Sequence, residues 1–292
     1  MGRERDIAAV TILNVIFTII EIVGGLLTNS LAILADALHD SGDSIALLSS
    51  WYLERRAKRP PDAVRTFGYK RLSLFAALFS ALVLVGGSIF ILIEAVGRLR
   101  NPEGVNAEGM MVFAILGIVF NTVGFLRLHR GHAINDRVLS WHLLEDVLGW
   151  FAILAGGTII RLTGSSTIDP ILTIGFTFFV LWGVGRNLRE VFNVLLEGVP
   201  SHINVGKVKE SLLAIDGVLG VHDVHIWSME GETDFFTGHI IVEDELLLKP
   251  DRTRRTIKEV LRNHHIEHST TELESKEFCS GIECGLNITE KR

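Results

Sequence analysis

Long apolar stretches separated by short polar segments fill the first two thirds of the chain. Six of them can be delimited, at about residues 8–28, 31–52, 72–98, 107–127, 138–161 and 168–192. A helix that crosses a lipid bilayer needs roughly 20 consecutive, mostly apolar residues. The pattern therefore predicts an α-helical membrane protein with six transmembrane helices.

The apolar stretches stop near residue 198, and the following pattern is typical of a folded domain outside the membrane. Residues 205–215 and 251–264 have apolar positions at a helical spacing, whereas residues 218–230 and 234–244 favour strands. A Gly-Val-Pro turn at 198–200 ends the last apolar stretch. We expect a membrane domain over residues 1–198 and a small cytoplasmic α/β domain over residues 199–292.

The composition agrees with a membrane protein and excludes a nucleic-acid-binding one. Hydrophobic residues make up 48% of the chain, and the mean hydropathy is +0.36. The formal net charge of -6 provides no excess of positive charge for binding a phosphate backbone.

The distribution of Lys and Arg predicts the orientation in the membrane. Seven of these residues lie between positions 55 and 71, in the loop that joins the second and third apolar stretches. Because basic loops stay on the cytoplasmic side, we expect this loop and both termini to be cytosolic. Arg98 and Arg100, at the other end of the third stretch, oppose this orientation.

The second apolar stretch contains four titratable side chains, Asp36, His39, Asp40 and Asp43. An ionised aspartate near the middle of a membrane helix costs about 2.5–3.5 kcal/mol, so such residues indicate function. Asp36, His39 and Asp43 share one helix face, and Asp40 borders it. His39 and Asp43 are one turn apart and can bind the same ion.

The fifth stretch repeats this spacing with His142 and Asp146. Two imidazoles and two carboxylates match the tetrahedral preference of Zn²⁺, whereas Mg²⁺ and Ca²⁺ want six or more ligands and Cu(I) prefers sulfur. Hydrogen bonding between helices is the alternative explanation. Four other polar residues within the apolar stretches are weaker indications of a site, and each fits either explanation: Asn14, Glu21, Glu94 and Asn121.

Six motifs follow one another along the chain in the order of a known family. They are residues 13–47, FGYKRLSLFAAL at 67–78, HLLEDVLG at 142–149, IDP at 168–170, LLEGVP at 195–200 and GVHDVHIWSM at 220–229. On these motifs the chain resembles the zinc-transporting branch of the cation diffusion facilitator family over nearly its whole length. The resemblance implies that the transport site consists of His39, Asp43, His142 and Asp146.

The resemblance also implies a homodimer whose cytoplasmic domains have a ferredoxin-like, metallochaperone-like fold and bind further metal. By position, it indicates His222, His239, His268 and Glu272 as ligands of that regulatory metal. Because residues three apart in a strand point to opposite faces, we expect His225 to face away from His222.

Two further features concern the loops and the C-terminal tail. Cys279 and Cys284 either capture cytosolic zinc or remain free thiols in the tail. The loop between the fourth and fifth stretches holds only His129 and His132, where many eukaryotic relatives have a long histidine-rich tract. This suggests a compact transporter of prokaryotic type, in a bacterial inner membrane.

Zinc binding requires neutral imidazoles and ionised carboxylates, so protons compete with the metal. The sequence contains no Walker A motif for ATP and no HExxH motif of a zinc enzyme. We therefore expect a transporter that exports zinc in exchange for protons, rather than an enzyme. Two alternatives stay open: the same transporter carrying Co²⁺, Cd²⁺, Fe²⁺ or Mn²⁺, and a zinc sensor that does not transport.

Overall fold

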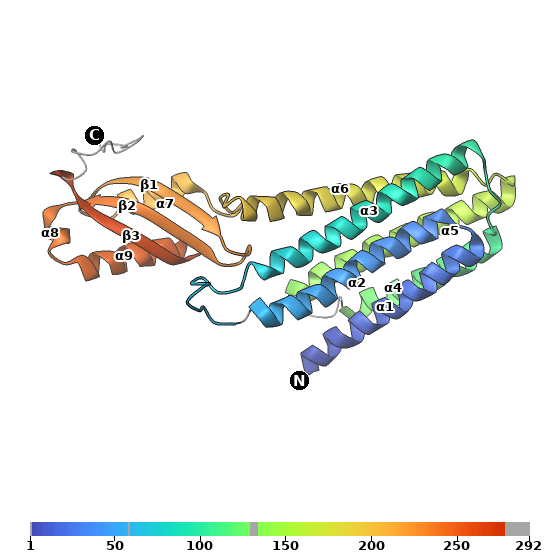
Figure 1. Cartoon of the computed structure of the whole chain (residues 1–292), viewed down its shortest axis with the longest axis horizontal. Helices are drawn as coiled ribbons and strands as arrows, with labels where there is room; N and C mark the ends of the chain where they lie inside the picture. The colour runs from blue at the N-terminus through green and yellow to red at the C-terminus, as the bar shows by residue number, and fades with distance from the viewer. Residues whose placement is uncertain (1, 58, 129–133, 278–292) are drawn as a thin grey trace. The chain divides into compact units, whose positions relative to one another are not determined.

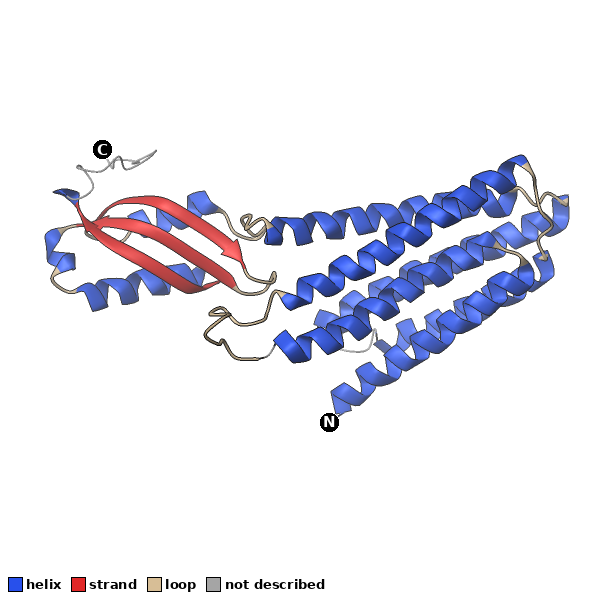
Figure 2. Cartoon of the chain, viewed as in Figure 1, coloured by secondary structure: helices blue, strands red, loops and turns tan. Residues whose placement is uncertain are grey.

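The computed structural model describes residues 2–57, 59–128 and 134–277. Contacts divide the chain into two compact units, one of Met1–Leu53 with Phe75–Leu188 and the other of Glu54–Leu74 with Arg189–Arg292. The first unit is helical, and the strands belong to the second (Figure 2). This confirms the predicted fold class, a helical membrane domain followed by a small α/β domain.

Six long helices come first in the chain. They are α1 (Gly2–Thr28), α2 (Leu31–Ala57), α3 (Leu72–Arg100), α4 (Ala107–Leu128), α5 (Ile134–Thr163) and α6 (Ile168–Leu195) (Figure 1). Within the described residues, four segments are long and apolar enough to cross a membrane: Leu72–Arg100, Ala107–Leu126, Leu143–Thr163 and Ile168–Leu195. α1 has a shorter apolar part, Asn14–Thr28. The aspartates in the middle of α2 lower its hydropathy.

Small residues let the helices of the first unit pack closely. A Cβ atom on Gly117 of α4 would lie 2.2 Å from the Trp150 ring of α5, and one on Gly42 of α2 would lie 2.4 Å from Leu84 of α3. Trp150 is fully buried, and Phe17 packs edge-on against it with the ring centroids 6.0 Å apart. In a membrane such contacts matter because helix association depends on van der Waals packing.

The second unit is an α/β layer structure. Its elements after α6 are α7 (Val205–Leu213), β1 (Val218–Ser228), β2 (Asp234–Val242), α8 (Asp244–Leu247), α9 (Pro250–Asn263) and β3 (Ile266–Ser275). β2 is the central strand, antiparallel to β1 and parallel to β3. α7 and α9 lie against one face of the sheet (Figure 1). The core between these layers includes Val208, Leu212, Phe236, Ile240, Ile257 and Leu261.

Local sequence signals set the helix starts in this unit. The side-chain oxygen of Asn204 accepts the backbone N–H of Lys207 at 3.1 Å, which caps α7. Pro250 stands at the start of α9, where its missing N–H costs no helical hydrogen bond.

The segment between α2 and α3 belongs to the second unit through its own contacts. Phe67 packs edge-on against Phe235 of β2, with the ring centroids 5.5 Å apart. Nζ of Lys70 lies 3.2 Å from Oε1 of Glu230, just before β2. The segment is therefore tied to one end of the sheet.

Asp62 fixes a turn within the same segment. Its carboxylate accepts the backbone N–H groups of Val64 at 2.9 Å and Arg65 at 2.7 Å, and the Tyr69 hydroxyl at 2.5 Å. The hydrogen bond from Tyr69 and those from the backbone hold the pKa of Asp62 below its usual range. Stability from a lowered carboxyl pKa is lost only as the pH falls through that lowered value. The turn therefore keeps these bonds over the whole neutral range.

Gly117→Ala should destabilise the helical unit, because its new methyl group would overlap the buried Trp150 ring. Overpacking typically costs about 1–3 kcal/mol, against a gain of about 1 kcal/mol from Ala over Gly in a helix. Thermal unfolding of the purified protein in detergent measures the effect. Gly183→Ala in α6 is the matched control, since a Cβ atom there meets nothing within 4 Å. Equal melting temperatures for the two variants would contradict the packing at Gly117.

Candidate metal centre

The middle of α2 brings three potential metal ligands together. Nε2 of His39 lies 3.7 Å from Oδ2 of Asp43, one helical turn further along. One ligand atom each from His39, Asp40 and Asp43 lies within 4.8 Å of the others. The side chains of His39 and Asp43 are 22% and 30% exposed, whereas Asp40 is buried. One divalent ion can therefore reach all three residues.

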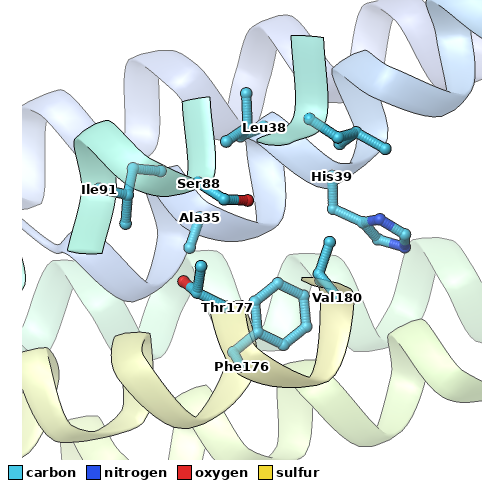
Figure 3. A pocket seen from close by; sticks show the side chains of 9 residues that line it. Ala35, Leu38, His39, Ser88, Ile91, Phe176, Thr177 and Val180 are labelled. Atoms are coloured by element: carbon cyan, nitrogen blue, oxygen red, sulfur yellow. The ribbon is translucent and has the colours of Figure 1, made fainter. Parts of the chain in front are cut away.

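Side chains of α3 and α6 surround His39. The pocket beside it is lined, among others, by Leu84 and Ser88 of α3 and by Phe176 and Thr177 of α6 (Figure 3). Phe176 meets the imidazole edge-on, with the ring centroids 6.1 Å apart. Most of the lining side chains are apolar. Apolar surroundings lower the local dielectric constant, which strengthens the attraction between a cation and the ligands beside it.

α5 contributes Asp146, which is buried, and carries His142 one turn earlier in the same continuous helix. The side chain of His142 lies outside the described residues, so its part in a four-ligand site stays a prediction. Among the described side chains, Asp146 does not join the group of His39, Asp40 and Asp43.

Asp146 belongs instead to a group of buried acids between α1, α2 and α5. The carboxyl groups of Asp36, Asp40 and Asp146 all interact electrostatically with Glu21 of α1. The exposed fractions are 1% for Glu21, 2% for Asp36, 4% for Asp40 and 7% for Asp146. Oδ1 of Asp36 lies 4.0 Å from the position of a Cβ atom on Gly149, so Asp36 points toward α5.

Asp40 links these two groups. It lies within coordination reach of His39 and Asp43, and it also interacts with Glu21. α2 thus presents an imidazole and a carboxylate beside a strongly acidic region, which favours a divalent cation with nitrogen and oxygen ligands. Glu21 was only a weaker signal in the sequence, because the helical period does not show which face of α1 meets α2.

A second group of potential metal ligands lies on the sheet, with one residue from each strand. Nε2 of His222 in β1 is 2.9 Å from Oε2 of Glu274 in β3, and Nδ1 of His239 in β2 is 2.5 Å from Oε1 of the same carboxylate. Glu274 is only 5% exposed. Glu272, which pairs with His239 in register, has Oε2 at 3.6 Å from Nε2 of that histidine. Two imidazoles around a buried carboxylate form a set that Zn²⁺ accepts.

Within the described residues, none of the other predicted cytoplasmic metal ligands belongs to the group of His222, His239 and Glu274. His268 packs against Phe235, with ring centroids 4.8 Å apart, and does not join His222, His239 and Glu274. Cys279 and Cys284 lie outside the described residues. Glu274 was missed in the sequence, although strand residues two apart share a face and Glu272 was a candidate.

The prediction that His222 and His225 point to opposite faces of the sheet is wrong, because β1 contains a bulge. Asp223 has a positive φ of 49°, and the register shifts between His222 and His225. His222 pairs with His239 and His225 pairs with Thr237, two positions of β2 that share one face. Nε2 of His225 lies 3.0 Å from Oδ1 of Asp223, and among the described residues the candidate group consists of His222, His239 and Glu274. Only His222 of the two histidines therefore joins the ligand group.

Comparison with known proteins gives consistent matches over nearly the whole chain. A family model described as the cation efflux transmembrane domain matches residues 7–196, and one described as the cation efflux protein, cytoplasmic domain, matches residues 200–276.

Three curated relatives illustrate the similarity. The metal cation efflux system protein CzcD of Cupriavidus metallidurans is 36% identical over 94% of this chain and 87% of its own length. Zinc transporter ZitB of Escherichia coli is 37% identical over 93% of this chain and 87% of its own length. A cadmium, cobalt and zinc/H(+)-K(+) antiporter of Bacillus subtilis is 30% identical over 94% of this chain and 90% of its own length.

Glu274→Gln should weaken zinc binding at the sheet by at least about tenfold, because loss of a partner around a metal site typically costs 10–100-fold in affinity. Titration of the full-length protein with zinc against a competing dye measures the change. Glu267→Gln is the matched control, as an exposed glutamate of the same strand. Equal affinities in the two variants would rule out Glu274 as a ligand.

Proposed function

Since the chain belongs to the cation efflux family and is therefore an integral membrane transporter of metal cations, we propose that it exports zinc from the cytosol in exchange for protons. The transport site consists of His39, Asp43, His142 and Asp146. α2 and α5 expose this site alternately to the two sides of the membrane, in a bacterial inner membrane.

The contact between His39 and Asp43 carries this proposal. An imidazole and a carboxylate one turn apart, 3.7 Å from each other inside an apolar helical unit, are costly there unless they serve a cation. His142 and Asp146 have the same spacing on α5, and we propose that they approach His39 and Asp43 when the metal binds, which would complete a tetrahedral set for Zn²⁺.

The names of the relatives support zinc and leave room for related ions. ZitB is named as a zinc transporter, whereas the Bacillus relative is named for cadmium, cobalt and zinc. Imidazole and carboxylate ligands also suit Co²⁺, Fe²⁺ and Mn²⁺. Zinc is favoured because a four-ligand site with two histidines meets its tetrahedral preference.

Proton exchange follows from the chemistry of the ligands. Zinc binds to neutral imidazoles and ionised carboxylates, so its arrival releases protons and its departure takes them up. The buried acids Glu21, Asp36 and Asp40 next to the site increase the need for a cation or a proton whenever the metal leaves. The name of the Bacillus relative includes H(+) and K(+) as exchanged ions.

The basic segment between α2 and α3 supports a cytosolic position of that segment and of both termini. Arg98, at the opposite end of α3, is locally neutralised. Its Nε lies 3.1 Å from Glu94, its Nη2 lies 3.4 Å from Glu103, and its Nη1 donates to the carbonyl of Asn29 at 2.8 Å. The seven basic residues between positions 55 and 71 outnumber Arg98 and Arg100 at this end, and the orientation follows the larger group.

Metal at the sheet regulates transport in this proposal. His222, His239 and Glu274 bind cytosolic zinc, with Glu272 beside them, and His268, Cys279 and Cys284 remain further candidates. Zinc that binds between two cytoplasmic domains tightens a homodimer, because a ligand that binds only the assembled form shifts the equilibrium toward it.

Asp43→Ala and Asp146→Ala should each abolish zinc/proton exchange in proteoliposomes, because each removes a charged ligand of the transport site. Folding should be retained or improved, since a costly intramembrane charge is lost. Zinc uptake driven by an imposed pH gradient is the measurement. Glu145→Ala, an exposed glutamate next to Asp146, is the control and should transport normally. Exchange in both aspartate variants would refute the site, and an inactive wild type would favour a zinc sensor.

His39→Asp should broaden the set of transported ions toward Mn²⁺ and other harder cations, because an oxygen replaces a borderline nitrogen ligand. Uptake of each metal into the same proteoliposomes gives the profile. Ser41→Ala, a nearby polar residue of α2 whose hydroxyl bonds the Ala37 carbonyl at 2.6 Å, controls for disturbance of the helix. An unchanged profile for His39→Asp would mean that selectivity resides elsewhere.

A further inference from the structure

A carboxylate from α6 holds the N-terminus of α2. Asp169 lies in the first turn of α6 and is completely buried. Its Oδ2 accepts the backbone N–H of Leu31 at 2.8 Å, and its Oδ1 accepts the N–H of Ala32 at 3.3 Å and the hydroxyl of Ser30 at 2.6 Å. The first N–H groups of a helix have no partner within that helix. Asp169 therefore satisfies donors that α2 cannot satisfy by itself.

Neighbouring residues complete this joint. Oγ of Ser30 accepts the backbone N–H of Ile33 at 3.3 Å, as an N-cap serine does. Arg98 of α3 interacts electrostatically with Asp169. A negative charge at a helix N-terminus is also stabilised by the helix dipole.

The same helix carries His39 and Asp43 further along. With a rise of 1.5 Å per residue, His39 lies roughly 12 Å and Asp43 roughly 18 Å along the axis from Leu31. A helix that is fixed at one end can still tilt, and the displacement then grows with distance from the fixed end. Separating α2 from α6 at the joint would instead leave buried polar groups without hydrogen-bond partners, which is unfavourable.

We propose that Asp169 is a positioning residue for metal transport, which keeps the N-terminus of α2 joined to α6 throughout the transport cycle. The ligands on α2 then move by tilting about this joint, and α2 does not slide along α6. The inference rests on the proposed transport site, because Asp169 acts through α2 and does not contact the metal.

The first test compares exchange rates per folded molecule. Asp169→Asn keeps the shape of the side chain but loses its charge and places an amide donor among N–H donors. Its maximum rate of zinc/proton exchange should fall by about tenfold or more, while the KM for zinc changes by less than about threefold, because the ligands are intact. Size-exclusion chromatography gives the folded amount. A normal rate per folded molecule would mean that Asp169 is merely structural, and would overturn the proposal.

Thr173→Val is the matched control for this test. It changes a buried polar residue of α6, one turn after Asp169, and leaves the carboxylate in place. Its exchange rate should stay close to that of the wild type. A loss as large as that of Asp169→Asn would show that any polar change in this turn is damaging, and would also overturn the specific role of Asp169.

The second test replaces the hydrogen bond by a covalent one. Ser30→Cys and Asp169→Cys are combined in the full chain, with Cys279 and Cys284 changed to Ser. The reduced protein should be slow, since the cap is lost, and oxidation to the disulfide should restore at least half of the exchange rate of the cysteine-free parent. Slower exchange after oxidation would show that the two ends must separate. A pair that does not cross-link would show that they are not held together. Either result would overturn the proposal.

Asp43→Ala in the same assay separates this inference from the proposed function. If Asp43→Ala is inactive while Asp169→Asn is normal, only the positioning role is wrong. If Asp43→Ala still transports zinc, the transport site is elsewhere, and the positioning role falls with it.

Discussion

The cost of burying carboxylates among apolar helices is the constraint on which the helical unit depends. Glu21, Asp36, Asp40 and Asp146 are each at most 7% exposed. Such groups are expensive to hold in ionised form unless a cation, a proton or a hydrogen-bond donor offsets the charge. The unit is consequently most stable with metal bound or with protons bound. These two forms are the two ends of the exchange that we propose.

Local spacing was sufficient to predict the helices and the contact between His39 and Asp43, because the helical period is a property of one segment. It was insufficient wherever two helices meet. Glu21 was only a weak polar signal, and Asp169 appeared only as part of the IDP motif, because their partners on α2 lie far away in sequence. Asp169 and Ser30, for example, are 139 positions apart. Whether His142 completes the ligand set depends on packing that the spacing alone does not determine.

The sheet shows the same limit in another form. Two of its strands, β1 and β2, were predicted from β-branched and aromatic residues, but β3 was not predicted, and neither was the face of each histidine. One extra residue in β1, marked by the positive φ of Asp223, cancels the simple alternation between His222 and His225. The partner carboxylate, Glu274, comes from a strand that pairs in parallel with β2 after α8 and α9. The ligand group therefore depends on strand pairing between segments that are separated in sequence by helices.

α2 combines a fixed end with a charged middle. At its N-terminus, the hydroxyl and N–H donors of Ser30, Leu31 and Ala32 meet a fully buried carboxylate. In its middle, His39 and Asp43 are partly exposed, 22% and 30%, and are 3.7 Å apart, longer than a hydrogen bond. A metal ion that binds these ligands therefore acts on the middle of α2, at a distance from its fixed end, while in our proposal the joint with α6 keeps the helix in register.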